Sequence, residues 1–172
     1  MLLCVGLPAA ALRAQERSRD FDRVALGQSI ALITANSRLG ITVYMSEGGL
    51  GYLDGFSPPD VRAWVDSSRK LMTAPTPPRT QDRLTFYGPS ISGVRGASLT
   101  MMRVVTNKSD RAYVSLRSRG GVYHMSGFAK SIEEAEVLLR QLSEAADTID
   151  EWRGTPHVVG DSISTGAPRP PQ

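Results

Sequence analysis

Residues 48–56 read GGLGYLDGF and residues 120–128 read GGVYHMSGF, so a glycine pair, a later glycine and a phenylalanine recur in the second half of the chain. Glycine supplies the positive φ angles that tight hairpin turns need. A phosphate-binding loop would need a G-K-[ST] sequence leading into a helix, and neither stretch has one. We therefore interpret both glycine pairs as turns between strands.

A helix pattern follows each of these stretches. Ser57 suits the N-cap, Pro58 the first helical position and Asp60 the first turn. Ser131 and Glu134 have the spacing of a capping box. Apolar residues then recur at i, i+3 and i+4, which gives each helix one face to bury. The predicted buried stripes are Val61, Trp64, Val65, Ser68, Leu71 and Met72, and Ala135, Leu138, Leu139, Leu142, Ala146 and Ile149.

Strand-like runs precede each glycine pair. They are rich in β-branched residues, with alternating apolar positions such as Ile41, Val43 and Met45. They cover residues 29–36, 40–46, 97–106 and 112–118, and residues 83–88 add a further strand to the second half. We predict an α+β fold of two tandem antiparallel strand-strand-strand-helix units, which form one pseudo-twofold domain because one half alone buries too little apolar surface.

The predicted domain is residues 22–153, with repeats at about 22–73 and 83–152. Hydrophobic residues make up 41% of the 172-residue chain, enough for an ordinary core. Residues 154–172 have no sustained period and end in prolines, so a disordered tail is expected there.

Residues 1–14 resemble a signal peptide. An apolar run from Leu2 to Ala11 leads into small residues, and ten apolar residues are too few to span a bilayer. No Lys or Arg precedes the run, so either the start of the signal peptide is missing or the resemblance is accidental. We expect a periplasmic or secreted protein without a transmembrane segment, and a cytoplasmic protein is the alternative. Cys4, the only cysteine, would be removed with the leader.

Catalytic, cofactor and metal sites find no support in the sequence. His124 and His157 have no Cys, His or carboxylate at ligand spacing. Asp54 could serve as an acid or base, but Ser126 takes its place in the second repeat. We therefore expect a protein that is not an enzyme and needs no cofactor.

Charge is distributed unevenly along the chain. Residues 79–119 hold eight basic and two acidic side chains, whereas residues 131–151 hold seven acidic and one basic. The net charge of +3 is too small to indicate nucleic acid by itself. The uneven distribution instead predicts a positive and a negative side.

The candidate surface for an anionic partner lies in the basic segment. Arg111, Tyr113 and Arg117 alternate with core-type residues, so they should share the outer face of a strand. Arg103 and Arg119 are expected nearby. An ordinary solvated sheet face would show the same pattern, and the partner surface is the sharper hypothesis, with Tyr113 available for stacking.

The topology of two tandem strand units, each closed by a helix, resembles that of the Whirly and Pur-type single-stranded nucleic-acid-binding proteins over residues 22–152. That resemblance implies single-stranded nucleic-acid binding as the alternative function. Our leading expectation is an exported, non-catalytic binding or structural domain with an unknown ligand or protein partner. Unpaired sheet edges would allow two copies to form a homodimer.

Overall fold

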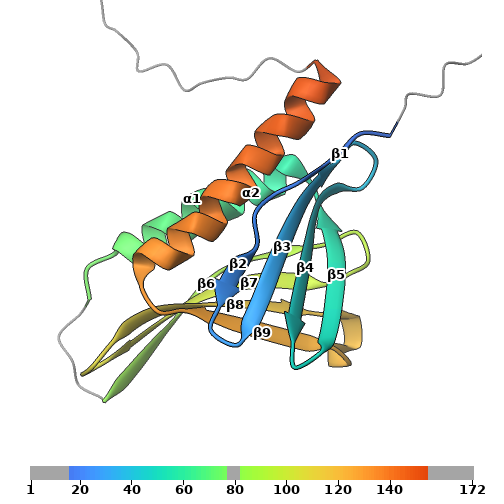
Figure 1. Cartoon of the computed structure of the whole chain (residues 1–172). Helices are drawn as coiled ribbons and strands as arrows, with labels where there is room; N and C mark the ends of the chain where they lie inside the picture. Colours follow the sequence, from blue (N-terminus) through green and yellow to red (C-terminus); the bar gives the residue numbers. More distant parts are fainter. Residues whose placement is uncertain (1–15, 77–81, 155–172) are drawn as a thin grey trace, which may run out of the picture.

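The computed structural model describes residues 16–76 and 82–154 (Figure 1). The predicted leader lies outside these residues, and so does the predicted tail except for Gly154. That glycine has a φ of 66° and caps the last helix.

The first half is an antiparallel sheet followed by a helix. Its elements are β1 (Ser18–Asp20), β2 (Val24–Leu26), β3 (Ser29–Asn36), β4 (Gly40–Glu47), β5 (Leu50–Phe56) and α1 (Pro58–Thr73). The strands pair in the order β1-β3-β4-β5, and β2 also pairs with β3. Because β1 and β2 contact different parts of β3, they act as one interrupted edge strand.

The second half follows the same plan. It contains β6 (Arg83–Ser92), β7 (Ser98–Thr106), β8 (Asp110–Arg117), a short 3-10 turn η1 (Arg119–Gly121), β9 (His124–Ala129) and α2 (Ile132–Arg153). The strand order is β6-β7-β8-β9, all antiparallel. The predicted α+β fold, with each sheet followed by a helix, is confirmed. A twofold relation between the halves stays a prediction.

Both helices begin where the sequence predicts. The backbone N–H of Asp60 donates to Ser57 Oγ, and that of Glu134 donates to Ser131 Oγ, each at 3.3 Å. Glu134 completes its cap by accepting the N–H of Lys130 at 2.7 Å. All predicted stripe residues are buried except Leu71, which is half-buried.

Both glycine pairs form turns. Gly48 and Gly49 have φ values of 58° and 84°, and Gly120 and Gly121 have values of 79° and 73°. Only the first pair closes a two-residue hairpin, because Glu47 pairs directly with Leu50. The second pair belongs to a longer connection through η1.

The matching phenylalanines point to opposite faces of their sheets. Phe56 pairs with Ile41 and is buried under the helices, with 1% of its surface exposed. Phe128 pairs with Tyr113, and both are half-buried, whereas Ala112 and Val114 on the other side of the strand are in the core. The matching sequences therefore do not place equivalent side chains at these positions.

The helices lie side by side against the inner faces of both sheets (Figure 1). Arg62 on α1 forms ion pairs of 2.7 Å with Asp147 and Asp150 on α2, and Arg69 pairs with Glu136 at 2.6 Å. The order of these pairs shows that the helices run antiparallel. Three acidic side chains of α2 are thus paired with arginines of α1.

A buried carboxylate joins the two halves. Asp54 on β5 is fully buried and accepts backbone N–H groups from Gly55, Arg95 and Ala97 at 2.7, 2.9 and 2.7 Å. The last two belong to the β6–β7 turn of the second half. Asp54, which the sequence analysis considered as an acid or base, therefore binds the backbone of a turn in the other half.

Candidate binding face

The second sheet has one face packed against the core and one turned away from the helices. Strand pairing and alternation assign the outward positions. We call this surface the outer face of the second sheet. Its residues are Arg83, Thr85, Tyr87, Ser90, Ser92, Ser98, Thr100, Met102, Val104, Thr106, Arg111, Tyr113, Ser115, Arg117, His124, Ser126 and Phe128.

Charge on the outer face has a single sign. Arg83 and Arg117 are exposed, and Arg111 is half-buried. Within these four described strands, none of the outward positions is Asp or Glu. The face therefore presents cations with no carboxylate beside them to neutralise their field.

A row of aromatic and thioether side chains crosses the outer face. Tyr87 pairs with Met102, Met102 with Tyr113, and Tyr113 with Phe128, so one row runs over all four strands. The Tyr113 and Phe128 rings lie 5.9 Å apart, and Tyr87 is 77% exposed. Four strands at about 4.8 Å spacing make the row roughly 14 Å long.

A row of hydroxyl groups lies beside the aromatic row. Ser90 pairs with Thr100, Thr100 with Ser115, and Ser115 with Ser126. The Ser90 hydroxyl is 2.8 Å from that of Ser98 and 2.9 Å from that of Thr100. A planar ligand on the aromatic row would have hydrogen-bonding groups along one side.

Arg111 is held by a ring and keeps unpaired donors. Its guanidinium carbon lies 5.6 Å from the centre of the Phe128 ring. Its Nε–H is buried and has no hydrogen-bond partner among the described residues. Because the ring accepts no hydrogen bond and the buried Nε–H is out of reach of a ligand, an anion would have to approach the two terminal nitrogens of the guanidinium.

The β2–β3 turn limits how much of Phe128 is accessible. A Cβ atom on Gly27 would clash with the Phe128 ring, so only glycine allows this turn to close over the ring. The Ser29 hydroxyl also donates to the Ser126 carbonyl at 2.6 Å. The first half thereby covers the β9 edge of the face.

Arg103 lies on the inner face instead of beside Arg111. It pairs with Ala112, a core position, and is 6% exposed. Its guanidinium donates to the Leu71 and Ala74 carbonyls at 3.1 and 2.6 Å and forms an ion pair of 2.7 Å with Asp110. Hydrogen bonding to Asp110 raises the pKa of Arg103 further above its ordinary value. The residue therefore caps the C-terminal end of α1.

The predicted set is thus divided among three places. Arg111, Tyr113 and Arg117 share the outer face as predicted, and Arg103 is internal. Arg119 is exposed in η1, where its side chain lies against Gly96 of the β6–β7 turn. Sequence reasoning did not include Tyr87, Met102 and Phe128, although their outward alternation in strand-like runs was visible.

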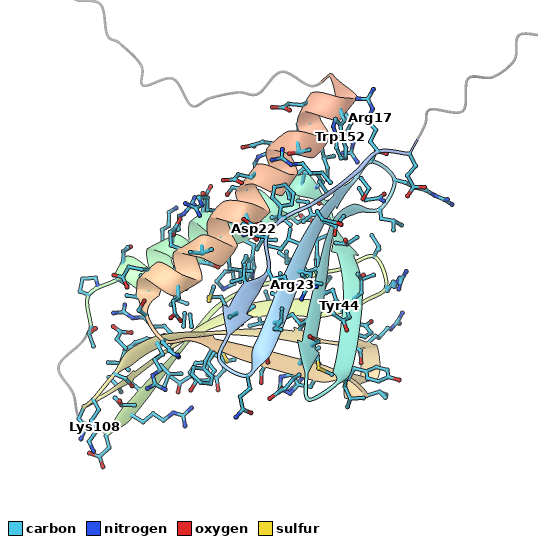
Figure 2. The ribbon with its side chains drawn as sticks, in the orientation of Figure 1. Arg17, Asp22, Arg23, Tyr44, Lys108 and Trp152 are labelled. Carbon is cyan, nitrogen blue, oxygen red and sulfur yellow. The ribbon has the colours of Figure 1, made fainter. Side chains whose placement is uncertain are left out.

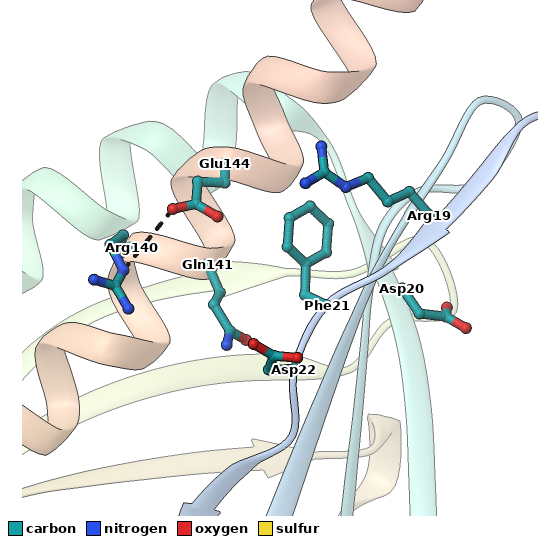
Figure 3. A pocket seen from close by; sticks show the side chains of 7 residues that line it. All are labelled: Arg19, Asp20, Phe21, Asp22, Arg140, Gln141 and Glu144. Atoms are coloured by element: carbon teal, nitrogen blue, oxygen red, sulfur yellow. Dashed lines mark ion pairs between the residues drawn. The ribbon is translucent and has the colours of Figure 1, made fainter.

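A polar cleft of about 180 Å³ opens elsewhere, between the β1–β2 connection and α2 (Figure 3). It is lined by Arg19, Asp20, Phe21, Asp22, Arg140, Gln141 and Glu144. Arg19 stacks over the Phe21 ring at 4.9 Å, and Arg140 pairs with Glu144 at 3.8 Å. Because both signs of charge line the cleft, it favours neither anions nor cations.

In the part of the chain that the structure describes, no group of three or more His, Cys, Asp or Glu side chains is placed to hold a metal ion. No helix in residues 16–76 and 82–154 has the length and apolar character needed to cross a bilayer. Models of known protein families and curated proteins were compared with the chain, and none of them matches it.

Proposed function

We propose that this protein is an exported, non-catalytic binding domain that holds an acidic polysaccharide on the outer face of the second sheet. The observation that carries the proposal is the juxtaposition of Arg83, Arg111 and Arg117 with an aromatic row, on a face without carboxylates. Export rests on the apolar run in residues 1–14.

Each row of the face would have its own role in binding. Arginine forms strong, charge-assisted hydrogen bonds with phosphate, sulfate and carboxylate groups. Exposed rings such as Tyr87 stack against flat or apolar ring faces, and the adjacent hydroxyls bond to polar substituents. An extended polymer with a ring and an anion in each unit matches this arrangement.

The position of the acidic side chains supports the choice of this face. The acids of α2 lie on the opposite side of the sheet, and three of them are paired with Arg62 and Arg69. Figure 1 shows both helices on the side of the second sheet that faces the first. An anionic polymer would therefore meet cations on the outer face and repulsion on the helical side.

Single-stranded nucleic acid is the second candidate ligand. Two observations favour it: each half is an antiparallel sheet followed by a helix, as in the Whirly and Pur-type resemblance, and the aromatic row offers the Tyr87 and Tyr113 rings for base stacking. The interrupted edge strand β1–β2 also gives the first half a fourth position in its sheet, as in the second half.

Titration with two polymers tests the proposal. The purified protein is titrated with an acidic polysaccharide and with a labelled oligothymidylate, each at low and moderate salt. Binding through three or four cations should weaken by roughly 20- to 100-fold between about 50 and about 200 mM salt. Arg111→Ala should weaken binding, whereas Lys70→Ala, which removes an exposed cation from α1, should not.

The outcomes separate the candidates. Preference for the polysaccharide supports the leading proposal, and preference for the oligonucleotide supports the alternative. If neither polymer binds, or if Arg111→Ala and Lys70→Ala have equal effects, the outer face is not the binding surface.

A further inference from the structure

Three connections from both halves lie along one end of the second sheet, where β5 runs from the β8–β9 connection to the β6–β7 turn. They are the β4–β5 turn, the β6–β7 turn and the β8–β9 connection through η1. The Tyr52 and Tyr123 rings stack at 5.7 Å with an interplanar angle of 18°. The Val94 N–H donates to the Gly55 carbonyl at 2.8 Å, and Arg119 lies against Gly96. We call this region the loop end.

The loop end carries most of the strongly exposed large apolar side chains. Val122 is 78% exposed, Val94 69%, Leu50 65% and Tyr123 48%. Among the described residues, Tyr87 on the outer face is the only other large apolar side chain above 45%. Burial of such side chains in the fold would have been favourable, so their exposure points to a partner surface.

The turns hold these side chains clear of the body. A Cβ atom added at any of Gly48, Gly49, Gly120 and Gly121 would have no neighbour within 4 Å. Leu50 and Val122 directly follow these glycine pairs. The two aliphatic side chains therefore stand at turns that nothing else in the described chain covers.

Cations accompany the apolar side chains. Arg95 and Arg119 are exposed in the same turns, and Arg117 lies at the end of β8. The acidic residue in these segments is Glu47, which is half-buried. The loop end thus combines protruding aliphatic groups with excess positive charge.

We propose that the loop end docks on the surface of an anionic lipid bilayer. Leu50, Val94 and Val122 enter the boundary between headgroups and acyl chains, and Arg95 and Arg119 contact lipid phosphates. Peripheral proteins bind membranes by this combination of shallow apolar burial and attraction to anionic lipids. A lipid surface fits the loop end better than a protein partner does, because the apolar side chains stand on separate turns and do not form one flat patch.

This inference is independent of the proposed polymer binding, since it concerns a different surface. It also differs from membrane spanning, because only the tips of the turns reach the lipid. Docking would orient the molecule with its sheets rising from the membrane.

Vesicle sedimentation tests the inference. The full chain is mixed with phosphatidylcholine vesicles with or without phosphatidylglycerol. Leu50→Ser with Val122→Ser should weaken binding to anionic vesicles by about tenfold or more, since two buried aliphatic contacts are lost. Arg95→Ala with Arg119→Ala should weaken binding to anionic vesicles and abolish the preference for them.

Matched controls keep the result interpretable. Val137→Ser changes an apolar side chain that is 37% exposed on α2, away from the loop end, and it should leave vesicle binding unchanged. The apolar residues 2–11 are the same in every protein compared, so they cannot account for a difference between variants. Circular dichroism checks that each variant remains folded.

Any of three results would overturn the inference. One is equal vesicle binding by the wild type and the Leu50→Ser, Val122→Ser variant. Another is a wild-type dimer that these substitutions convert to a monomer, because the loop end would then be covered by a second copy. Loss of vesicle binding in Arg111→Ala alone would assign lipid contact to the outer face instead.

Discussion

The two sheets share a strand order but differ in what their outer faces present. Within the described strands, the outer face of the first sheet has no Lys, Arg or His, and its large side chains are Ile30, Leu32, Tyr44 and Leu53. The outer face of the second sheet has three arginines and no carboxylate. One architecture therefore supports two different surfaces, and function has to be argued from side chains.

The inner faces show a second contrast. Each contains one buried charged residue: Asp54 on β5, fully buried, and Arg103 on β7, 6% exposed. Asp54 holds the β6–β7 turn of the second half, and Arg103 holds the end of α1 in the first half. Each half therefore anchors a segment of the other with a charge of opposite sign.

Asp54→Ala should break this reciprocal anchoring with the largest effect. Two buried backbone N–H groups and one part-buried N–H would lose a charged acceptor, which should lower the free energy of unfolding by about 3–5 kcal/mol. Urea denaturation measures the change. Asp66→Ala, which removes an exposed carboxylate from α1, should change it by less than about 0.5 kcal/mol. Similar values for both variants would mean that Asp54 does not anchor the turn.

Arg103→Met should have the next largest effect. The Leu71 and Ala74 carbonyls would lose their donor, and Asp110 would lose its partner, at a cost of about 2–4 kcal/mol. The matched control is Arg140→Met, which removes a surface pair with Glu144 and should cost less than about 1 kcal/mol. If Arg103→Lys is as stable as the wild type, the bidentate geometry is unimportant.

Tyr87→Ala and Tyr44→Ala should sharpen the contrast between the outer faces. Tyr87 is 77% exposed, so its removal should weaken polymer binding by about 1–3 kcal/mol with little loss of stability. Tyr44, which is labelled in Figure 2, lies over Gly51 on the first sheet, so its removal should lower stability and leave binding unchanged. Both variants are compared by ligand titration and thermal unfolding. Equal losses of binding would make the first sheet part of the site.

Local patterns allowed the helices and turns to be predicted. Ser57 and Ser131 cap their helices with neighbours three residues away, and the glycine pairs adopt positive φ within their own turns. The strands β1 and β2 were missed because each has three residues, too few for a period to be visible. For the candidate site, alternation placed Arg111, Tyr113 and Arg117 on one face but could not show that Arg103 faces inward.

The opposite directions of Phe56 and Phe128 also have a physical cause. Leu50 pairs with Glu47 across a two-residue turn, whereas His124 pairs with Arg117 across a six-residue connection. Side chains alternate along a strand, so the different connection changes which face each phenylalanine occupies. A sequence match through the glycine pairs cannot detect this change.

The amino-acid sequence by itself determined the helix starts, the glycine turns and the α+β class, because these depend on residues within one turn or one strand. Only the tertiary structure decided which charges are buried and which form a surface. Arg103 meets Leu71 and Ala74, and Asp54 meets Ala97, across 32, 29 and 43 residues of chain. Such contacts depend on how two sheets and two helices pack together, which no local pattern specifies.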